Sequence, residues 1–402
     1  MRASFLHYGS IQKIAILYII IWSISPPLEI DMIYRLIALA CAGIWGIFAI
    51  TRGLPYERQH LYALFFLLMV CLIGFIETSS LKGVLRQIAI IILVLCFIIN
   101  YFYQGRWEEL KGIIPIVLIV FIFFNLKTAA VLIEDPTIAR KLVRADESIY
   151  PYLRQGVGGY NLIYPQVCIF PAILAWIIKA FRNNKTCFLI GCVWLISYVL
   201  CILNAGYSIA IFATILGMFM LWFYKGENVL GAFLMAIVIF LIGLGSILYV
   251  DGIRNSLLQI FDGTAVAKKI NDLVASAEAG AAEGSIYVRI NAYRSSLKAI
   301  FNYPIIGGLW FGSGGGHSAL LDAFAKYGVW GGYIYAKMLF HVPNYYNRNI
   351  EHRYIRAISN AVLVSILFVC IFDSFTYSFM CMVLLVLPLL YEDIIGWERI
   401  NE

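Results

Sequence analysis

The sequence predicts an all-α, polytopic integral membrane protein with about twelve transmembrane helices. Hydrophobic residues make up 62% of the 402 residues and charged residues only 13%, a composition that excludes an ordinary soluble domain. Apolar stretches of about 20 residues, the length that crosses a bilayer as a helix, recur along the chain with short polar connections. The mean hydropathy of +0.85 agrees with this pattern. Because little sequence lies outside the stretches, residues 1–402 are expected to form a single membrane domain.

The predicted spans are separated by polar turns. The first begins at Ile14 behind Arg2 and Lys13 and resembles a signal peptide, but it lacks a small-residue cleavage site, so we expect it to be retained. The next four end at polar or charged turns, the sixth begins after a glycine run, and the tenth follows the longest connection. The twelve spans are expected at residues 14–31, 34–51, 60–76, 87–103, 112–133, 161–180, 187–204, 209–224, 229–250, 319–340, 357–373 and 376–392.

The distribution of cations predicts the orientation. With the N-terminus in the cytoplasm, half of the 30 Lys and Arg residues fall in short cytoplasmic connections and tails, which satisfies the positive-inside rule. Both termini are therefore expected in the cytoplasm. The formal charge of +7 then reflects cations at the cytoplasmic face, and no nucleic acid partner is expected.

Two outward loops are longer than the other connections. They are the shorter periplasmic loop, residues 134–160, and the large periplasmic loop, residues 251–318. Long loops are translocated regardless of their charge, so the cations in them agree with the topology. Two interpretations of these cations stay open: a charge-balanced solvated surface, or an extracytoplasmic site for an anionic substrate.

The large loop carries two predicted helices. Residues 264–283 have apolar residues at helical spacing and are expected to lie on the membrane surface as a cover. Residues 286–301 carry an apolar stripe of Ile286, Ile290, Tyr293, Leu297 and Ile300 and end before a proline. A helical wheel places Arg289 at the edge of this stripe and Arg294 on the opposite flank. An arginine in that position either snorkels past its neighbours or presents its planar guanidinium to phosphate.

A glycine-rich run, residues 307–316, leads into the tenth span. Glycines allow backbone N–H groups to point inward, and a helix N-terminus behind them adds its positive dipole end, so Gly314, Gly315 and Gly316 are candidate diphosphate ligands. No Lys-Ser/Thr closes the run and no strand precedes it, so the run is not a P-loop. The alternative is a flexible loop.

His317 is the only one of the five histidines expected outside the cytoplasm. A single histidine is too few for a metal site, and none is predicted. Its place beside the glycine run suggests proton transfer or a phosphate contact, whereas the plainer interpretation is a satisfied polar residue. The shorter loop has a similar arrangement, since Arg154 precedes closely spaced glycines at the start of a predicted helix. The alternative interpretation there is a capped turn at the membrane interface, with Tyr160 in an aromatic belt.

Four motifs in the large loop and the following helix resemble those of the O-antigen polymerase and O-antigen ligase superfamily of bacterial envelope glycosyltransferases. The motifs are Arg289-x3-Tyr293, Tyr303-Pro304-Ile-Ile-Gly307, Gly316-His317-Ser318-x3-Asp322 and Tyr327-Gly328-Val-Trp-Gly331. The His-Ser pair followed by Leu-Leu-Asp looks more like a polymerase, because ligases of this group typically have His-Asn. The stretch from Arg154 to Tyr160 also looks like the shorter-loop motif of the polymerases.

The resemblance implies a fold like the C-type glycosyltransferases and a metal-independent enzyme without cofactors in the bacterial inner membrane. It implies transfer of a growing glycan from undecaprenyl diphosphate to an incoming lipid-linked repeat unit of O-antigen, capsule or exopolysaccharide. Arg289 and Arg154 would hold the diphosphate, and His317 would contact phosphate or act as base. Asp322 would orient His317 or favour the helix N-terminus. Further candidates are Tyr160, Tyr293 and Arg294.

Two other functions stay open. A ligase would transfer the finished glycan to lipid A-core or to protein. A lipid-linked sugar flippase would also suit twelve spans, but transporters place binding residues near the bilayer midplane and often contain internal repeats, and no repeat is found here. The partners implied for a polymerase are the donor and acceptor glycolipids, membrane lipids and a chain-length regulator.

Overall fold

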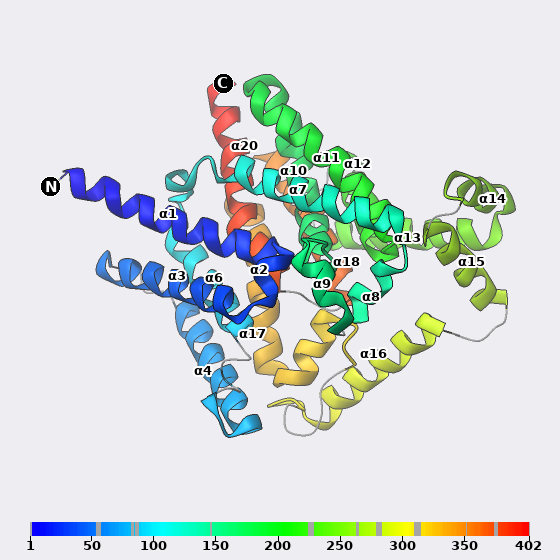
Figure 1. The fold of residues 1–402 in the computed structure, drawn as a ribbon, viewed down its shortest axis with the longest axis horizontal. Coiled ribbons are helices and arrows are strands. Elements are labelled where there is room, and N and C mark those ends of the chain that lie inside the picture. The colour runs from blue at the N-terminus through cyan, green and yellow to red at the C-terminus, as the bar shows by residue number, and fades with distance from the viewer. Residues whose placement is uncertain are drawn as a thin grey trace.

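The computed structural model of the chain is a bundle of helices (Figure 1). In the part of the chain that the structure describes, 89% of the residues are helical and no strand occurs, so the predicted all-α class is confirmed. The described residues are 2–53, 58–81, 84, 88–144, 147–223, 229–262, 265–278, 284–308, 315–350, 352–373 and 377–401.

Each of the twelve predicted apolar stretches coincides with helix. The corresponding elements are α1 (Arg2–Ile24) with α2 (Pro26–Ile30), α3 (Met32–Thr51), α4 (Arg58–Thr78), α6 (Ile88–Tyr103), α7 (Ile113–Glu134), α10 (Tyr160–Asn183), α11 (Lys185–Ala205), α12 (Ser208–Phe223), α13 (Val229–Tyr249), α17 (Ala319–Asn349), α18 (Arg353–Phe372), and α19 (Tyr377–Cys381) continuing through η3 (Met382–Val386) into α20 (Leu387–Asn401).

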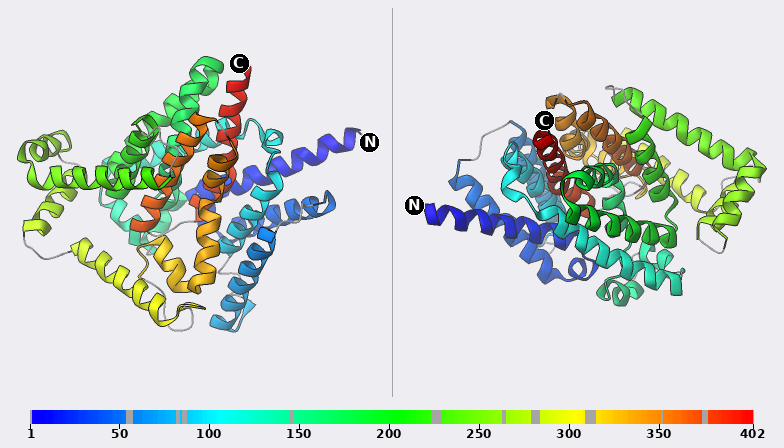
Figure 2. Two further views of the ribbon diagram at one scale, coloured as in Figure 1. Left: turned by 180° about the vertical axis from the view of Figure 1, so that it is seen from behind. Right: turned by 90° about the horizontal axis from the view of Figure 1, so that it is seen from above.

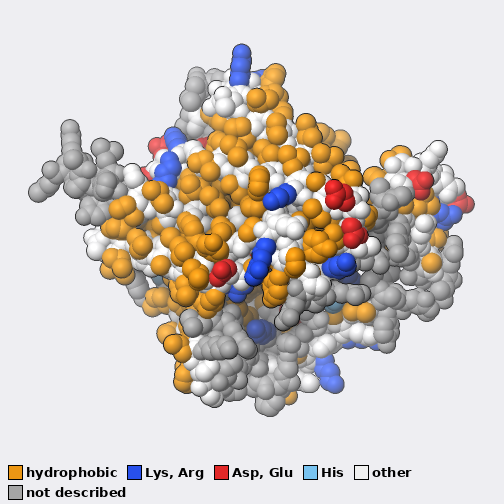
Figure 3. Space-filling model, viewed as in Figure 1, with side chains coloured by type: hydrophobic (Ala, Val, Ile, Leu, Met, Phe, Trp, Pro, Cys, Tyr) orange, Lys and Arg blue, Asp and Glu red, His pale blue; other side chains and the backbone are white. Residues whose placement is uncertain are grey.

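Among the described residues, six helices are long and apolar enough to cross a membrane, and α13 with the following helix makes a seventh if that bent pair is one span. Four more helices have apolar segments of 10–17 residues. Large hydrophobic side chains cover much of the face in Figure 3, with charged groups scattered among them. Exposed apolar surface on this scale suits contact with lipid rather than water. The chain is a helical membrane protein.

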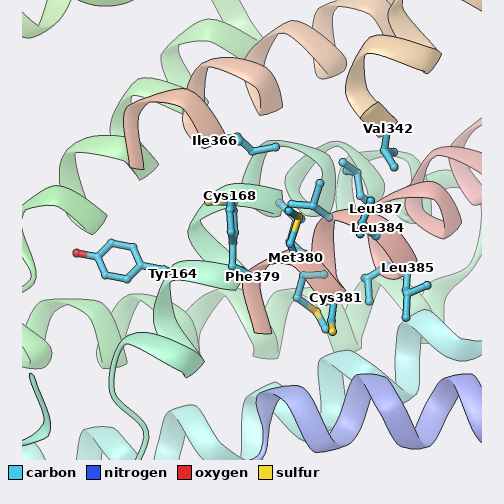
Figure 4. Packing of buried hydrophobic residues seen from close by; sticks show 14 of the residues in the cluster. Tyr164, Cys168, Val342, Ile366, Phe379, Met380, Cys381, Leu384, Leu385 and Leu387 are labelled. Carbon is cyan, nitrogen blue, oxygen red and sulfur yellow. The ribbon is translucent and has the colours of Figure 1, made fainter. Parts of the chain in front are cut away.

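The centre of the bundle is α10, which packs against α11, α12, α18 and α20. The N-terminal helices α1 and α3 extend from one end of the molecule, while α13, α14 (Asp251–Ile260) and α15 (Ala265–Glu278) project from the other (Figure 2). Figure 4 shows part of the buried core, where Cys168 of α10 faces Phe379 and Met380 of α19, and Tyr164 points away from this cluster. Tyr164 thus lies at the edge of the core.

A buried amide network fixes α7 and α11 against α10. Asn125 Nδ2 donates to Gln166 Oε1 at 2.8 Å, and Gln166 Nε2 donates to Asn125 Oδ1 at 2.9 Å. Trp194 Nε1 donates to the same Gln166 oxygen at 2.9 Å. Because buried amides are costly unless their hydrogen bonds are made, this network permits only one packing of the three helices.

The large loop is helical, as predicted. The expected helices at residues 264–283 and 286–301 correspond to α15 and to α16 (Gly284–Asn302). The apolar stripe is not the packing face of α16, because Ile290 and Leu297 are exposed while Ala292 and Ser296 are buried where α16 packs against α17. The reason is steric: the chain before α17 approaches α16 so closely that only small residues fit at the contact.

The predicted span 319–340 is broken at Gly328, whose backbone is non-helical, with a positive φ of +68° and ψ −173°. The turn that begins at Pro304 forms hydrogen bonds with the backbone on both sides of the break. Val329 N donates to Pro304 O at 2.8 Å, and Gly308 N donates to Ala325 O at 2.7 Å. A Cβ on Gly328 would lie 2.2 Å from Ile305 O. The break therefore depends on residues from another part of the chain.

Gly328→Ala is expected to lower the free energy of unfolding by about 2–5 kcal/mol, since it combines an unfavourable positive φ with overlap on backbone atoms. Gly53→Ala is the matched control, because Gly53 also has a positive φ, +76°, but open space around it. Thermal unfolding in detergent measures both. Equal losses from the two variants would show that the contact with Ile305 does not constrain the break.

Candidate functional site

The site is centred on an arginine held against a buried carboxylate. Arg289, on α16, donates through Nη1 to the carbonyl of Phe372, and its Nη2 lies 3.9 Å from Asp373 Oδ2. The Arg289 side chain is 29% exposed and that of Asp373 only 2%. The Tyr164 hydroxyl donates to the same Asp373 oxygen at 2.5 Å. A guanidinium has five N–H donors, so Arg289 can keep these contacts and still present donors to a ligand.

Tyrosines surround this pair. Tyr160 stacks edge-on against Tyr164 and Tyr207, with ring centroids 4.9 and 4.7 Å away, and it interacts electrostatically with Asp373 and Arg289. Tyr293, one helical turn from Arg289, lies beside the guanidinium. Burial raises the pKa of Tyr293, although Arg289 acts in the opposite direction, so its hydroxyl is neutral at pH 7 and able to donate a hydrogen bond.

The segment that carries His317 is attached on its N-terminal side to α16. Gly315 N donates to Ser296 Oγ at 2.8 Å, and Ser296 Oγ lies 2.5 Å from Asp322 Oδ1. A Cβ on Gly315 would lie 2.1 Å from Ala292 O, so this position requires glycine. His317 follows two residues later and is half-buried. The helix that presents Arg289 thus also holds the His317 segment.

On its C-terminal side the segment is attached to the end of α18. Ser318 Oγ donates to Cys370 O at 3.1 Å, and Ala319 N donates to Asp373 O at 2.8 Å. Ser318 N donates to Asp322 Oδ2 at 3.1 Å. Asp373 therefore contacts Arg289 with its side chain and the start of α17 with its backbone, which brings the two motif regions together.

The structure gives several predicted residues different surroundings. Asp322 accepts from Ser296 and Ser318, so it fixes the backbone beside His317. Arg154 and Arg294 are exposed, Arg154 at the end of α9 (Tyr150–Arg154) and Arg294 away from the α17 contact. Gly314 lies outside the described residues. Gly316 has a positive φ, +77°, with open space around it.

The N–H groups expected to bind phosphate are partly used inside the protein. Gly315 donates to Ser296, and in the shorter loop Gly158 N donates to Thr128 Oγ1 at 2.8 Å. Gly156 N and Val157 N donate to backbone carbonyls of α9. Gly315, Gly156 and Gly158 therefore use their N–H groups inside the protein, and these groups are not free to bind an anion.

Sequence reasoning missed Asp373, Ser296 and Tyr207. Asp373 had a usable signal, since an acid at the end of an apolar stretch is a functional candidate by default. Ser296 and Tyr207 had none, because a serine on a loop helix and a tyrosine at a helix start are common. Within the described residues, no group of His, Cys, Asp and Glu side chains suits a metal ion.

Ser296→Ala is expected to lower the free energy of unfolding by about 1–3 kcal/mol, because it leaves Gly315 N–H and one Asp322 oxygen without their partner. Ser295→Ala, at the exposed neighbouring position, is expected to have little effect. Thermal unfolding of both variants in detergent compares them. Equal stability would mean that Ser296 does not hold the His317 segment.

Comparison with protein-family models finds no match, and comparison with curated proteins finds none either.

Proposed function

We propose that this chain is a polysaccharide polymerase that joins polyprenyl-diphosphate-linked repeat units at the outer face of the bacterial inner membrane. The observation that carries the proposal is the set of contacts around Asp373. The Arg289 guanidinium lies against the Asp373 carboxylate, and Ala319 N, at the start of the helix that follows His317, donates to the backbone carbonyl of Asp373. These are the residues of the motifs that resemble the polymerases. The contacts support a single site built from α16, α17 and α18.

The chemistry follows from the charge of the leaving group. Departure of the glycan leaves a polyprenyl diphosphate whose charge is spread over several oxygens, and a guanidinium fork binds such a group in two places at once. Asp373 and Phe372 O hold that fork in position before the substrate arrives. Tyr293 lies beside it as a further donor, and His317 is the donor on the segment attached at Asp373. This preorganised arrangement stabilises charge that develops in the transition state.

The membrane arrangement is part of the same proposal: twelve spans in a C-type glycosyltransferase-like fold, with both termini in the cytoplasm. It predicts that Asn302→Cys, exposed at the end of α16, reacts with an impermeant thiol reagent in cells with a permeable outer membrane, while exposed Lys185→Cys reacts only after lysis. The nine native cysteines are free, so the unchanged chain supplies the background labelling. Protection of Asn302→Cys together with labelling of Lys185→Cys would reverse the orientation.

The function is tested by deleting the gene in cells that attach the glycan to lipid A-core. Loss of a polymerase leaves single repeat units on the core, because ligation continues. Loss of a ligase leaves a bare core and causes long lipid-linked polymer to accumulate. The second result would replace our proposal with the ligase function.

A further inference from the structure

A second carboxylate lies close to the Arg289 site, where it is bound by Asn161, the residue after Tyr160. Glu29, on the short helix α2, accepts a hydrogen bond from Asn161 Nδ2, and the Tyr377 hydroxyl lies beside its carboxylate. Arg35 donates from Nε to the backbone carbonyl of Glu29 at 2.9 Å. The Glu29 side chain is half-buried. Residues from three other elements thus surround one acid near the start of α10.

The Glu29 cluster is joined directly to the Arg289 site. Tyr160 interacts with Asp373 and Arg289, and the next residue, Asn161, binds Glu29. Consecutive Cα atoms are only about 3.8 Å apart, so both groups are tied to one turn of α10. The Glu29 cluster and the Arg289 site are also close along the chain, because Tyr377, beside Glu29, begins α19 shortly after Asp373, which follows α18. In Figure 1, α2 lies beside α9, against which it packs.

We propose that Glu29 is the general base that activates the acceptor hydroxyl, while Arg289 holds the donor diphosphate. The proposal rests on the polymerase function. A base must be able to reach the acceptor oxygen while it stays apart from the leaving group, because a carboxylate beside the diphosphate would repel it. Glu29 contacts α10 at Asn161, whereas Arg289 and Asp373 interact with Tyr160, the residue before it, so the carboxylate is near the site without being a partner of the arginine. His317, on the segment whose helix starts at Asp373 O, then serves the diphosphate.

The step balances as follows. The acceptor hydroxyl oxygen attacks the anomeric carbon of the donor glycan, and a glycosidic C–O bond forms. The C–O bond between that carbon and the diphosphate breaks, and the polyprenyl diphosphate leaves with the electron pair. The hydroxyl proton passes to the Glu29 carboxylate and from there to water. Arg289 stabilises the charge on the leaving group.

The test uses the purified full chain in lipid vesicles with lipid-linked repeat units extracted from cells that lack the chain. Glu29→Gln keeps an oxygen that can accept from Asn161 but removes the base, so kcat is expected to fall by about 10²–10⁴-fold. Asp31→Asn, two residues away, is the matched control. Asp31 caps α3 by accepting from Ile33 N at 2.9 Å, and asparagine caps equally well, so this variant is expected to keep the wild-type rate within about twofold.

Binding of farnesyl diphosphate, a short polyprenyl diphosphate, checks the donor side. Glu29→Gln is expected to bind it as the unchanged chain does, and Arg289→Ala is expected to lose binding. An unchanged kcat for Glu29→Gln, or a raised KM alone, would overturn the base assignment, as would loss of farnesyl diphosphate binding in that variant. If the unchanged chain makes no polymer, the polymerase function itself is wrong.

Discussion

Arg289→Lys is expected to lower the polymerisation rate by about 10²–10³-fold although it keeps the positive charge. The Arg289 guanidinium contacts Phe372 O and Asp373 through two different nitrogens, and in the proposed function the rest of its planar fork binds the diphosphate. An ammonium group is a single point charge, so it cannot bind two diphosphate oxygens in the same way. Polymer length and initial rate with the purified variant measure the effect.

The control for this variant is Lys298→Ala on the same helix. Lys298 is exposed, so removal of its charge should leave the rate unchanged within about twofold. The unfolding temperature of each variant separates a loss of activity from a loss of fold. A wild-type rate from Arg289→Lys would show that charge alone is needed at this position and that the planar fork has no role.

Asp373→Asn is expected to have the second largest effect, with loss of both activity and stability. The asparagine oxygen can still accept from Tyr164, but the charge opposite Arg289 is removed. Breaking a buried ion pair typically costs about 3–5 kcal/mol, and because Arg289 is 29% exposed we expect a smaller loss of about 1–3 kcal/mol in the free energy of unfolding. The polymerisation rate should fall by more than this loss of stability explains, because Arg289 loses the carboxylate that helps to hold it in position.

Asp251→Asn serves as its control. Asp251 also pairs with an arginine, Arg254, but its side chain is 75% exposed, and such pairs contribute about 0–1 kcal/mol. Thermal unfolding and polymerisation rate are measured for both variants. Normal activity and stability for Asp373→Asn would show that the carboxylate is not needed at the site and that Phe372 O alone holds Arg289.

The helices were predictable because hydrophobic runs long enough to span a bilayer leave few alternatives to helix. The break in α17 was not, because an isolated glycine in a helical pattern is normally tolerated. The backbone at Gly328 is stabilised by the turn at Pro304, whose carbonyl accepts a hydrogen bond from Val329 N. Boundaries set by local sequence were found, whereas those set by a distant turn were not.

The candidate site was predictable in part. The motifs located Arg289 and His317, and the structure places them in segments that share Asp373 as a partner. The glycines were harder to interpret, since a glycine required for a free N–H and one required for close packing look the same in sequence. Gly315 proved to be the second kind. Glu29 had no recognisable motif, because its surroundings come from three other elements.

Polymer formation by the purified chain tests the central claim most directly. The protein is placed in lipid vesicles with lipid-linked repeat units extracted from cells that lack the chain, without lipid A-core. The polymerase function predicts glycans of increasing length on the lipid carrier, with one free polyprenyl diphosphate released for each unit added. No chain growth by a folded protein, with transfer only after lipid A-core is added, would contradict it and identify a ligase.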